Sequence, residues 1–279
     1  MMTNMKNVIN LSAIALLVVG GLSMMLDTNE AYKDLASDSY KVIRVNGKIE
    51  FVKTKSSMKQ GDNYVVGTGI NFSTDKDRAA IINKVKGRSI LQPSKKGKPI
   101  VLPAANNINS RSGALINKID IMNHFSENYL VIGKMMVEVS AAKYVQNEKN
   151  FFYLAYQYKK NPEDEGELIR KKIPFQGNKM ILDRSEIFMV DNQPVPVQDV
   201  EMSLYYMDGG SNSGEKLAKF NPVFPDLENL KSEILIILAE SSENTKEGKI
   251  REITAYLNNF YGKPQKENVT TWLESEFDI

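Results

Sequence analysis

The sequence contains no cysteine. Disulfides, cysteine-ligated zinc, thiol catalysis and a lipid anchor on cysteine are therefore excluded. There is one histidine, His124, so a zinc site with two histidines is excluded and a serine triad could form only through that residue. The chain also lacks a Gly-x-Ser-x-Gly nucleophile elbow and a phosphate-binding Gly-Lys-Ser/Thr loop. His124, beside an aromatic residue, is interpreted as structural.

The acidic residues form no recognisable catalytic or metal-binding pattern. Asp183 and Glu186 could be a general acid/base pair, but carboxylate pairs at this spacing are common by chance. The stretch 75–77 begins like a calcium loop but lacks the glycine and the glutamate that such a loop needs. The acidic cluster 163–165 is interpreted as a solvated loop. We therefore expect no catalytic residue, no cofactor and no metal, and hence a protein that is not an enzyme.

A long apolar stretch, Val8 to Leu26, lies near the N-terminus and carries no charge. It is long enough to cross a bilayer core of roughly 30 Å as a helix. Lys6 before it and four acids soon after it fit an uncleaved anchor in the inner membrane, with the bulk of the chain in the periplasm. The alternative is a cleaved signal peptide with small residues at 21–23, which would release a soluble periplasmic or extracellular protein.

The net charge of +2 hides a division along the chain. Residues 40–102 hold 14 Lys/Arg against 4 Asp/Glu, whereas residues 161–279 hold 13 against 22. Such asymmetry is informative about partners, which here could be anionic lipid headgroups, an anionic cell-wall polymer or the acidic end of a second copy in a homo-oligomer. The candidate interaction surface is the group of basic residues Lys84, Lys86, Arg88, Lys95, Lys96 and Lys98.

Residues 40–102 alternate short apolar runs with turn residues, which predicts an antiparallel sandwich or small barrel. We expect a hairpin between 40–45 and 49–53 around Asn46-Gly47, because this dipeptide tolerates the positive φ angles of a type I′ turn. Short strands at 64–66 and 70–73 follow. A second hairpin is expected between 79–85 and 89–92 around Lys86-Gly87, and a last strand at 100–102.

These residues resemble the FecR-type domain of bacterial envelope sensors. The matching residues are Val42-x-x-Val45-x-Gly47-x-Ile49, Met58-x-x-Gly61-Asp62, Gly69-Ile70, Arg78-Ala79-Ala80-Ile81 and Gly87-Arg88-Ser89-Ile90-Leu91-x-Pro93. The resemblance implies a periplasmic, all-β and non-enzymatic domain. In that family a segment that binds a sigma factor usually precedes the membrane helix. Only seven residues precede the apolar stretch here, so we expect that segment to be missing.

Residues 103–113 are small, polar or turn-forming and are predicted to be a linker between domains. Residues 114–207 follow as a second sandwich-like β domain, with strands expected at 129–132, 135–139, 151–158, 168–175, 180–182, 187–190 and 200–207. The aromatic run 151–158, followed by Lys159 and Lys160, is interpreted as a core strand with its tyrosines on the outer face, rather than as a nucleic-acid stacking face. A sugar-stacking surface is also possible, but the sequence does not single out which rings are exposed.

The C-terminal region, 208–279, begins with a Gly/Ser-rich stretch at 208–214 that is predicted to be a flexible linker. The hydrophobic period then becomes helical. Asp226 and Thr245 are predicted N-caps of two helices, and a short third helix holds Val269, Trp272 and Leu273.

The expected architecture is mainly β with C-terminal α: two antiparallel β modules after an N-terminal membrane helix, plus two or three C-terminal helices. The leading functional hypothesis is a non-catalytic, membrane-anchored envelope protein that acts as scaffold, assembly factor or sensor through protein partners, without nucleic acid. One alternative is an envelope enzyme that acts on polysaccharide or peptide through carboxylates not located here. The other is a FecR-like signalling protein without the sigma-binding segment.

Overall fold

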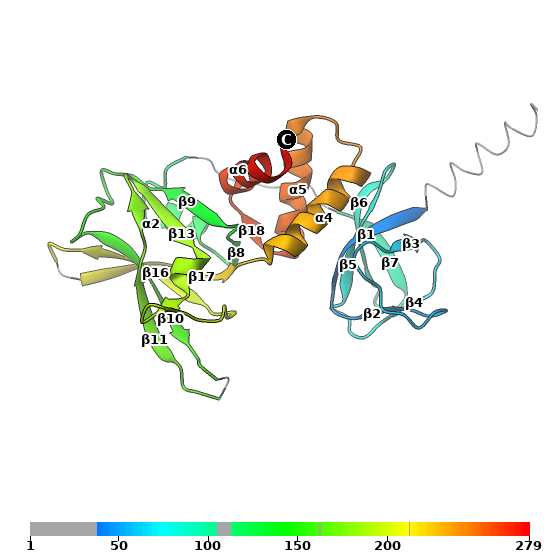
Figure 1. The fold of residues 1–279 in the computed structure, drawn as a ribbon, viewed down its shortest axis with the longest axis horizontal. Helices are drawn as coiled ribbons and strands as arrows, with labels where there is room; N and C mark the ends of the chain where they lie inside the picture. Colours follow the sequence, from blue (N-terminus) through cyan, green and yellow to red (C-terminus); the bar gives the residue numbers. More distant parts are fainter. Residues whose placement is uncertain (1–37, 105–112, 162, 212) are drawn as a thin grey trace, which may run out of the picture. The chain divides into compact units, whose positions relative to one another are not determined.

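The computed structural model describes residues 38–104, 113–161, 163–211 and 213–279. Within them the chain is mainly β and ends in helices, which confirms the predicted class in this coarse form (Figure 1). The chain divides into two compact units. One holds the described residues up to Pro103 with Ala239–Ser242, and the other holds Ala104–Leu238 with Glu243–Ile279. The stretch Val8 to Leu26 and most of the expected linker lie outside the described residues, among which no helix is long and apolar enough to cross a membrane.

Five strands of the first unit form one sheet in the order β3-β1-β5-β6-β7, and the remaining two, β2 and β4, pair separately. The side chains between them form a core around Tyr40, Val42, Tyr64, Ile81 and Leu91. The strands are β1 (Ser39–Asn46), β2 (Ile49–Phe51), β3 (Asn63–Val65), β4 (Ile70–Phe72), β5 (Arg78–Asn83), β6 (Gly87–Pro93) and β7 (Pro99–Pro103).

The predicted hairpin around Asn46-Gly47 is wrong. β1 pairs with β3 and β5, while β2 pairs with β4, so the chain turns a corner at Gly47 instead of folding back on itself. Gly47 has a φ of +87°, and a Cβ there would lie 2.1 Å from Asp77 Oδ1. The Asp77 carboxylate accepts hydrogen bonds from the Thr74 backbone and hydroxyl, both at 2.8 Å. Gly47 is thus needed for this close packing of two loops.

Local hydrogen bonds fix the second predicted hairpin, which is confirmed. β5 and β6 are antiparallel with Asn83 opposite Gly87, and β6 continues into β7. The three strands form a meander, so the β5–β6 turn and the β6–β7 turn lie at opposite ends of β6. The lysines of the two turns are therefore separated by the length of β6.

The second unit contains a six-stranded sheet in the order β11-β10-β16-β17-β8-β18, a three-stranded sheet β12-β13-β9 and the pair β14-β15. β8 pairs in parallel with both β17 and β18. The prediction that all strands of this domain are antiparallel is therefore wrong at this edge of the sheet. The strands are β8 (Asn128–Leu130), β9 (Lys134–Glu138), β10 (Phe151–Tyr158), β11 (Glu167–Lys172), β12 (Phe175–Gln176), β13 (Lys179–Asp183), β14 (Met189–Val190), β15 (Gln193–Pro194), β16 (Met202–Asp208), β17 (Ser213–Val223) and β18 (Lys263–Pro264).

Two further segments of this unit differ from the prediction. The Gly/Ser-rich stretch 208–214 is not a linker: it holds the end of β16 and the start of β17, which pair as a hairpin with Asp208 opposite Ser213. Turn-forming composition is shared by linkers and hairpins, so only the strand after it distinguishes them. The expected strand 187–190 is divided between the end of the short helix α3 (Arg184–Ile187) and β14.

Alternation along β10 places Phe152, Leu154, Tyr156 and Tyr158 in the core of the second unit. The Tyr156 hydroxyl donates to the Ile187 carbonyl at 2.6 Å, which satisfies its polar end inside the core. The prediction of a core strand is confirmed for this half of its residues, but the expectation that the tyrosines face outward is wrong for Tyr156 and Tyr158. The other half faces outward.

The helices are α2 (Lys118–His124), α3, α4 (Leu227–Glu240), α5 (Lys246–Phe260) and α6 (Lys266–Phe277). The predicted N-caps are confirmed, because Asp226 accepts from the Asn229 amide at 2.9 Å and Thr245 accepts from the Gly248 amide at 3.0 Å. Between α4 and α5 lies a buried carboxylate, Glu233, whose Oε2 accepts from the hydroxyls of Tyr256 at 2.7 Å and Tyr261 at 2.6 Å.

Candidate functional site

The basic residues predicted to form one interaction surface are separated by the strand meander. Lys84 and Lys86 lie in the β5–β6 turn, whereas Lys95, Lys96 and Lys98 lie in the β6–β7 turn. The seven residues of β6 separate the two groups by roughly 20 Å. Arg88 is only 5% exposed and contributes nothing to a surface. The structure therefore replaces one expected patch with two small exposed groups of lysines.

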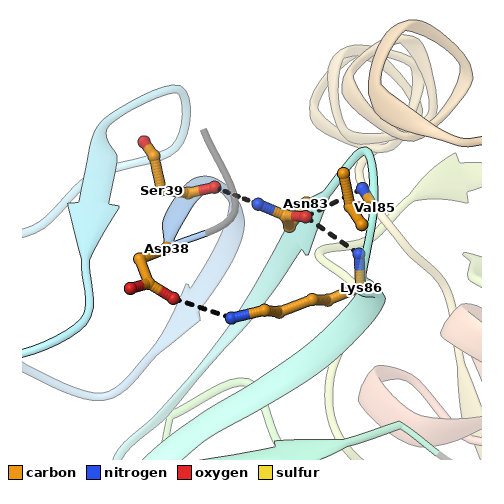
Figure 2. A network of polar contacts seen from close by, with 5 residues as sticks. All are labelled: Asp38, Ser39, Asn83, Val85 and Lys86. Carbon is orange, nitrogen blue, oxygen red and sulfur yellow. Dashed lines mark hydrogen bonds and ion pairs between the residues drawn. The ribbon is translucent and has the colours of Figure 1, made fainter. Parts of the chain in front are cut away.

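A polar network fixes the β5–β6 turn (Figure 2). The buried side chain of Asn83 donates from Nδ2 to the Ser39 carbonyl at 2.6 Å. Its Oδ1 accepts from the amides of Val85 at 2.8 Å and Lys86 at 2.9 Å. The Lys86 ammonium lies 2.7 Å from an Asp38 carboxylate oxygen, and this exposed ion pair raises the pKa of Lys86 through a side-chain hydrogen bond. Lys86 thus has an internal partner, which lowers its availability for an external one.

Of the two carboxylates considered for catalysis, Asp183 has a structural role and Glu186 is exposed. Asp183 caps α3, with Oδ1 accepting from the Ser185 amide at 2.9 Å and from its hydroxyl at 2.7 Å. Asp164 accepts from the Asn161 amide at 2.8 Å, which closes the acidic loop. Within the described parts of the chain, no three His, Asp or Glu side chains lie close enough together to hold a metal ion.

His124 lies at the end of α2 against Phe125 and Tyr129. Its Nε2 is 2.6 Å from the Tyr129 hydroxyl, which is itself buried. Burial, helped by the positive charge of Lys263, lowers the pKa of His124 to about 4. The imidazole is therefore neutral at physiological pH, and Tyr129 occupies one of its ring nitrogens.

His124 also borders a hollow of about 340 Å³ in the second unit. Two lysines and two glutamates line it together with amide and apolar side chains, so the charges balance. Among the described residues that line the hollow, Thr271 supplies the one hydroxyl group. The residues around the hollow are Gly113, His124, Lys134, Met136, Val137, Glu138, Lys179, Gln265, Glu267, Asn268 and Thr271.

An exposed apolar stripe runs along α2. Ile116, Ile119 and Met122 are 62%, 63% and 49% exposed. Ile116 directly precedes the N-cap residue Asn117, whereas Ile119 and Met122, three residues apart, lie on one side of the helix and Ile121 packs into the core. The helix start is fixed by Asn117, whose Oδ1 accepts from the amides of Ile119 at 2.9 Å and Asp120 at 3.0 Å. We call Ile116, Ile119 and Met122 the α2 stripe.

A second unusual surface is the outward face of β10 and its neighbours. The rings of Tyr153 and Tyr205 stack with centroids 5.0 Å apart and planes 9° from parallel. The Lys172 ammonium lies 4.4 Å from the ring centroid of Phe151. The sequence shows the aromatic residues of β10, but Tyr205 and Lys172 join them only through strand pairing. We call Phe151, Tyr153, Tyr205, Arg170, Lys172 and Lys216 the aromatic–basic face.

No protein-family model matches the chain, and no curated protein sequence matches it significantly. The resemblance of residues 40–102 to the FecR-type domain therefore rests on the sequence pattern alone. The candidate surfaces of the second unit are the α2 stripe and the aromatic–basic face.

Proposed function

We propose that the protein is a non-catalytic, membrane-anchored component of the bacterial cell envelope that works through protein–protein contacts. Val8 to Leu26 holds it in the inner membrane, and its two β modules lie in the periplasm. There it acts as a scaffold, assembly factor or sensor. The β domain that resembles the FecR type, residues 40–102, stands nearest the membrane, and the second unit carries the contact surface.

The α2 stripe is the observation that supports this proposal. Large apolar side chains that stand next to one another on a surface mark sites where another macromolecule binds. Two contacts hold the N-terminal end of α2 in place: Asn117 caps the helix, and the Lys118 ammonium lies 2.8 Å from Glu215 on β17. A preformed surface binds a partner without the entropic cost of ordering a flexible segment.

The polar chemistry of the second unit is consistent with a binding role. The carboxylate of Asp183 caps a helix, and that of Glu233 accepts from two buried tyrosines. The imidazole of His124 is hydrogen-bonded to the Tyr129 hydroxyl. These groups stabilise the fold, so the proposal assigns function to surfaces rather than to a reaction centre.

Crosslinking in intact envelopes followed by affinity capture tests the proposal. The variant Ile119→Asp places a charge in the centre of the α2 stripe, and Leu235→Asp is the matched control, since Leu235 is also exposed, at 57%, but lies on α4. We expect the wild type and the control to capture the same protein and Ile119→Asp to lose it. Equal capture by all three would refute the contact.

The anchor is tested separately. The full chain is expected in the membrane pellet after carbonate extraction, with its original N-terminus. A mature N-terminus near Met24 would show that the segment is cleaved and that the protein is exported in soluble form.

A further inference from the structure

The outward side of the large sheet in the second unit brings together residues from four strands. Cross-strand partners share a face of a sheet, so the register gives its composition directly. Tyr153 pairs with Lys172 on one side and with Tyr205 on the other, and Tyr205 pairs in turn with Lys216. This row therefore reads Lys-Tyr-Tyr-Lys across the sheet, and its two lysines are roughly 14 Å apart at the usual strand spacing.

The rows beside it continue the same pattern. Ala155 pairs with Arg170 and with Ser203, which adds a third cation and a floor of two small side chains. Ser203 pairs with Lys219, whose ammonium is already 2.5 Å from Glu201. The two rows, Lys172-Tyr153-Tyr205-Lys216 and Arg170-Ala155-Ser203-Lys219, contain no carboxylate. The face therefore combines aromatic rings with an excess of positive charge, although residues 161–279 as a whole are acidic.

The ring of Tyr153 reaches across β16 towards β17. A Cβ at Gly214 would lie 2.3 Å from the Tyr153 hydroxyl oxygen, so the glycine leaves the space that this ring occupies. Burial and the neighbouring Tyr205 raise the pKa of Tyr153, and the positive charge of nearby Arg170 offsets part of this rise. The two tyrosines thus form a fixed, half-buried plate with cations at its edges.

We propose that the aromatic–basic face binds an acidic polysaccharide. The C–H faces of sugar rings pack on the aromatic plate, where the electron-rich faces of the tyrosines attract the slightly positive hydrogens. Carboxylate or phosphate groups along the polymer pair with Arg170, Lys172 and Lys216 through charge-assisted hydrogen bonds. This face is distinct from the α2 stripe: α2 is ion-paired to Glu215, which points to the opposite side of β17 from its neighbour Lys216.

The stacking geometry favours a sugar polymer over single-stranded nucleic acid. Proteins that bind single strands stack successive bases on free aromatic faces. Tyr153 and Tyr205 already cover one another at 5.0 Å, so a base cannot enter between them. A sugar chain needs only the combined outer surface of the pair, with anchoring charges on either side.

Fluorescence anisotropy with a labelled oligogalacturonate tests the inference on the full chain in neutral detergent. The methyl ester of the same oligomer keeps the sugar rings and removes the charge, and oligothymidylate represents nucleic acid. We expect the acidic oligomer to bind and its ester to bind roughly tenfold more weakly or worse. Tyr153→Leu is expected to weaken binding roughly fivefold or more through lost stacking.

Lys172→Gln tests the charges without altering the rings. It should weaken binding of the acidic oligomer and reduce the salt dependence of that binding. The matched control is Lys84→Gln in the first unit, whose exposed lysine is outside the face and should leave binding unchanged. Circular dichroism confirms that each variant is folded.

Three results would overturn the inference. The first is an absence of binding at millimolar oligogalacturonate, or binding that both folded variants retain. The second is equal binding of the methyl ester, which would remove the role of the cations. The third is tighter binding of oligothymidylate, which would identify the face as a nucleic-acid site. Because the face lies apart from the α2 stripe, none of these results bears on the protein contact proposed for that helix.

Discussion

Replacing Asn83 with alanine should selectively destabilise the first unit. The side chain is 3% exposed and makes three hydrogen bonds, one to the Ser39 carbonyl of β1 and two from the amides of the β5–β6 turn. At about 0.5–1.5 kcal/mol for each bond, the loss amounts to about 1.5–4.5 kcal/mol. That energy increases the population of the unfolded first unit by roughly 10-fold to 2,000-fold.

Hydrogen exchange measured by mass spectrometry is the suitable assay, because it reports each unit separately. We expect faster exchange in peptides from β1, β5 and β6 of Asn83→Ala and no change in peptides from β10 and β16. Asn83→Asp keeps the oxygen that accepts from the turn but loses the amide donor to Ser39, so its effect should be intermediate.

Lys86→Ala is the internal control from the same network. It removes only the exposed ion pair with Asp38, and exposed pairs contribute little to stability. Unchanged exchange in β5 of Asn83→Ala, or an equal acceleration in Lys86→Ala, would refute the argument that the buried amide organises this turn.

Three further predictions concern single side chains. Burial lowers the pKa of His124 to about 4, so the free energy of unfolding keeps its full value above the unfolded pKa of about 6.5. It should fall by up to about 3 kcal/mol as the pH drops from there towards 4. His124→Phe should flatten this dependence, and NMR of the single histidine should show a pKa near 4. Tyr256→Phe removes one of the hydroxyls that donate to Glu233, so the free energy of unfolding of the second unit should fall by about 1–3 kcal/mol. Denaturant unfolding followed by the fluorescence of Trp272 measures this loss, and Tyr205→Phe, on the surface, should leave the free energy unchanged. Gly47→Ala should lower the melting temperature of the first unit, because residue 47 has a positive φ and the added Cβ collides with Asp77. Gly61→Ala introduces the same backbone strain but its Cβ meets no neighbour, so it should lower the melting temperature less.

Features determined by neighbouring residues could be predicted from the sequence. Asp226 and Thr245 cap their helices because a cap needs only the amides two or three residues ahead. The β5–β6 hairpin formed as predicted because Asn83 bonds to its own turn. The density of aromatic residues in 151–158 similarly identified a core strand, although not which of its tyrosines face inward.

Features that depend on distant pairing could not be predicted. Asn46-Gly47 is typical of a hairpin, but β4 is the partner of β2, and Asp77 lies against the glycine. Arg88 was expected on a surface because the sequence does not show that its strand is covered. The aromatic–basic face requires Tyr205 and Lys172 to pair with Tyr153, and their sequence positions give no indication of that register.

Photo-crosslinking in intact envelopes, residue by residue along α2, tests the central claim most directly. A photoreactive side chain is placed in turn at Ile116, Ile119 and Met122, and at Lys118, whose ammonium is paired with Glu215. The proposed protein contact predicts adducts to one partner from the three stripe positions and little from position 118. Equal labelling at all four positions, or no protein adduct at any of them, would contradict the claim that the α2 stripe is a contact surface.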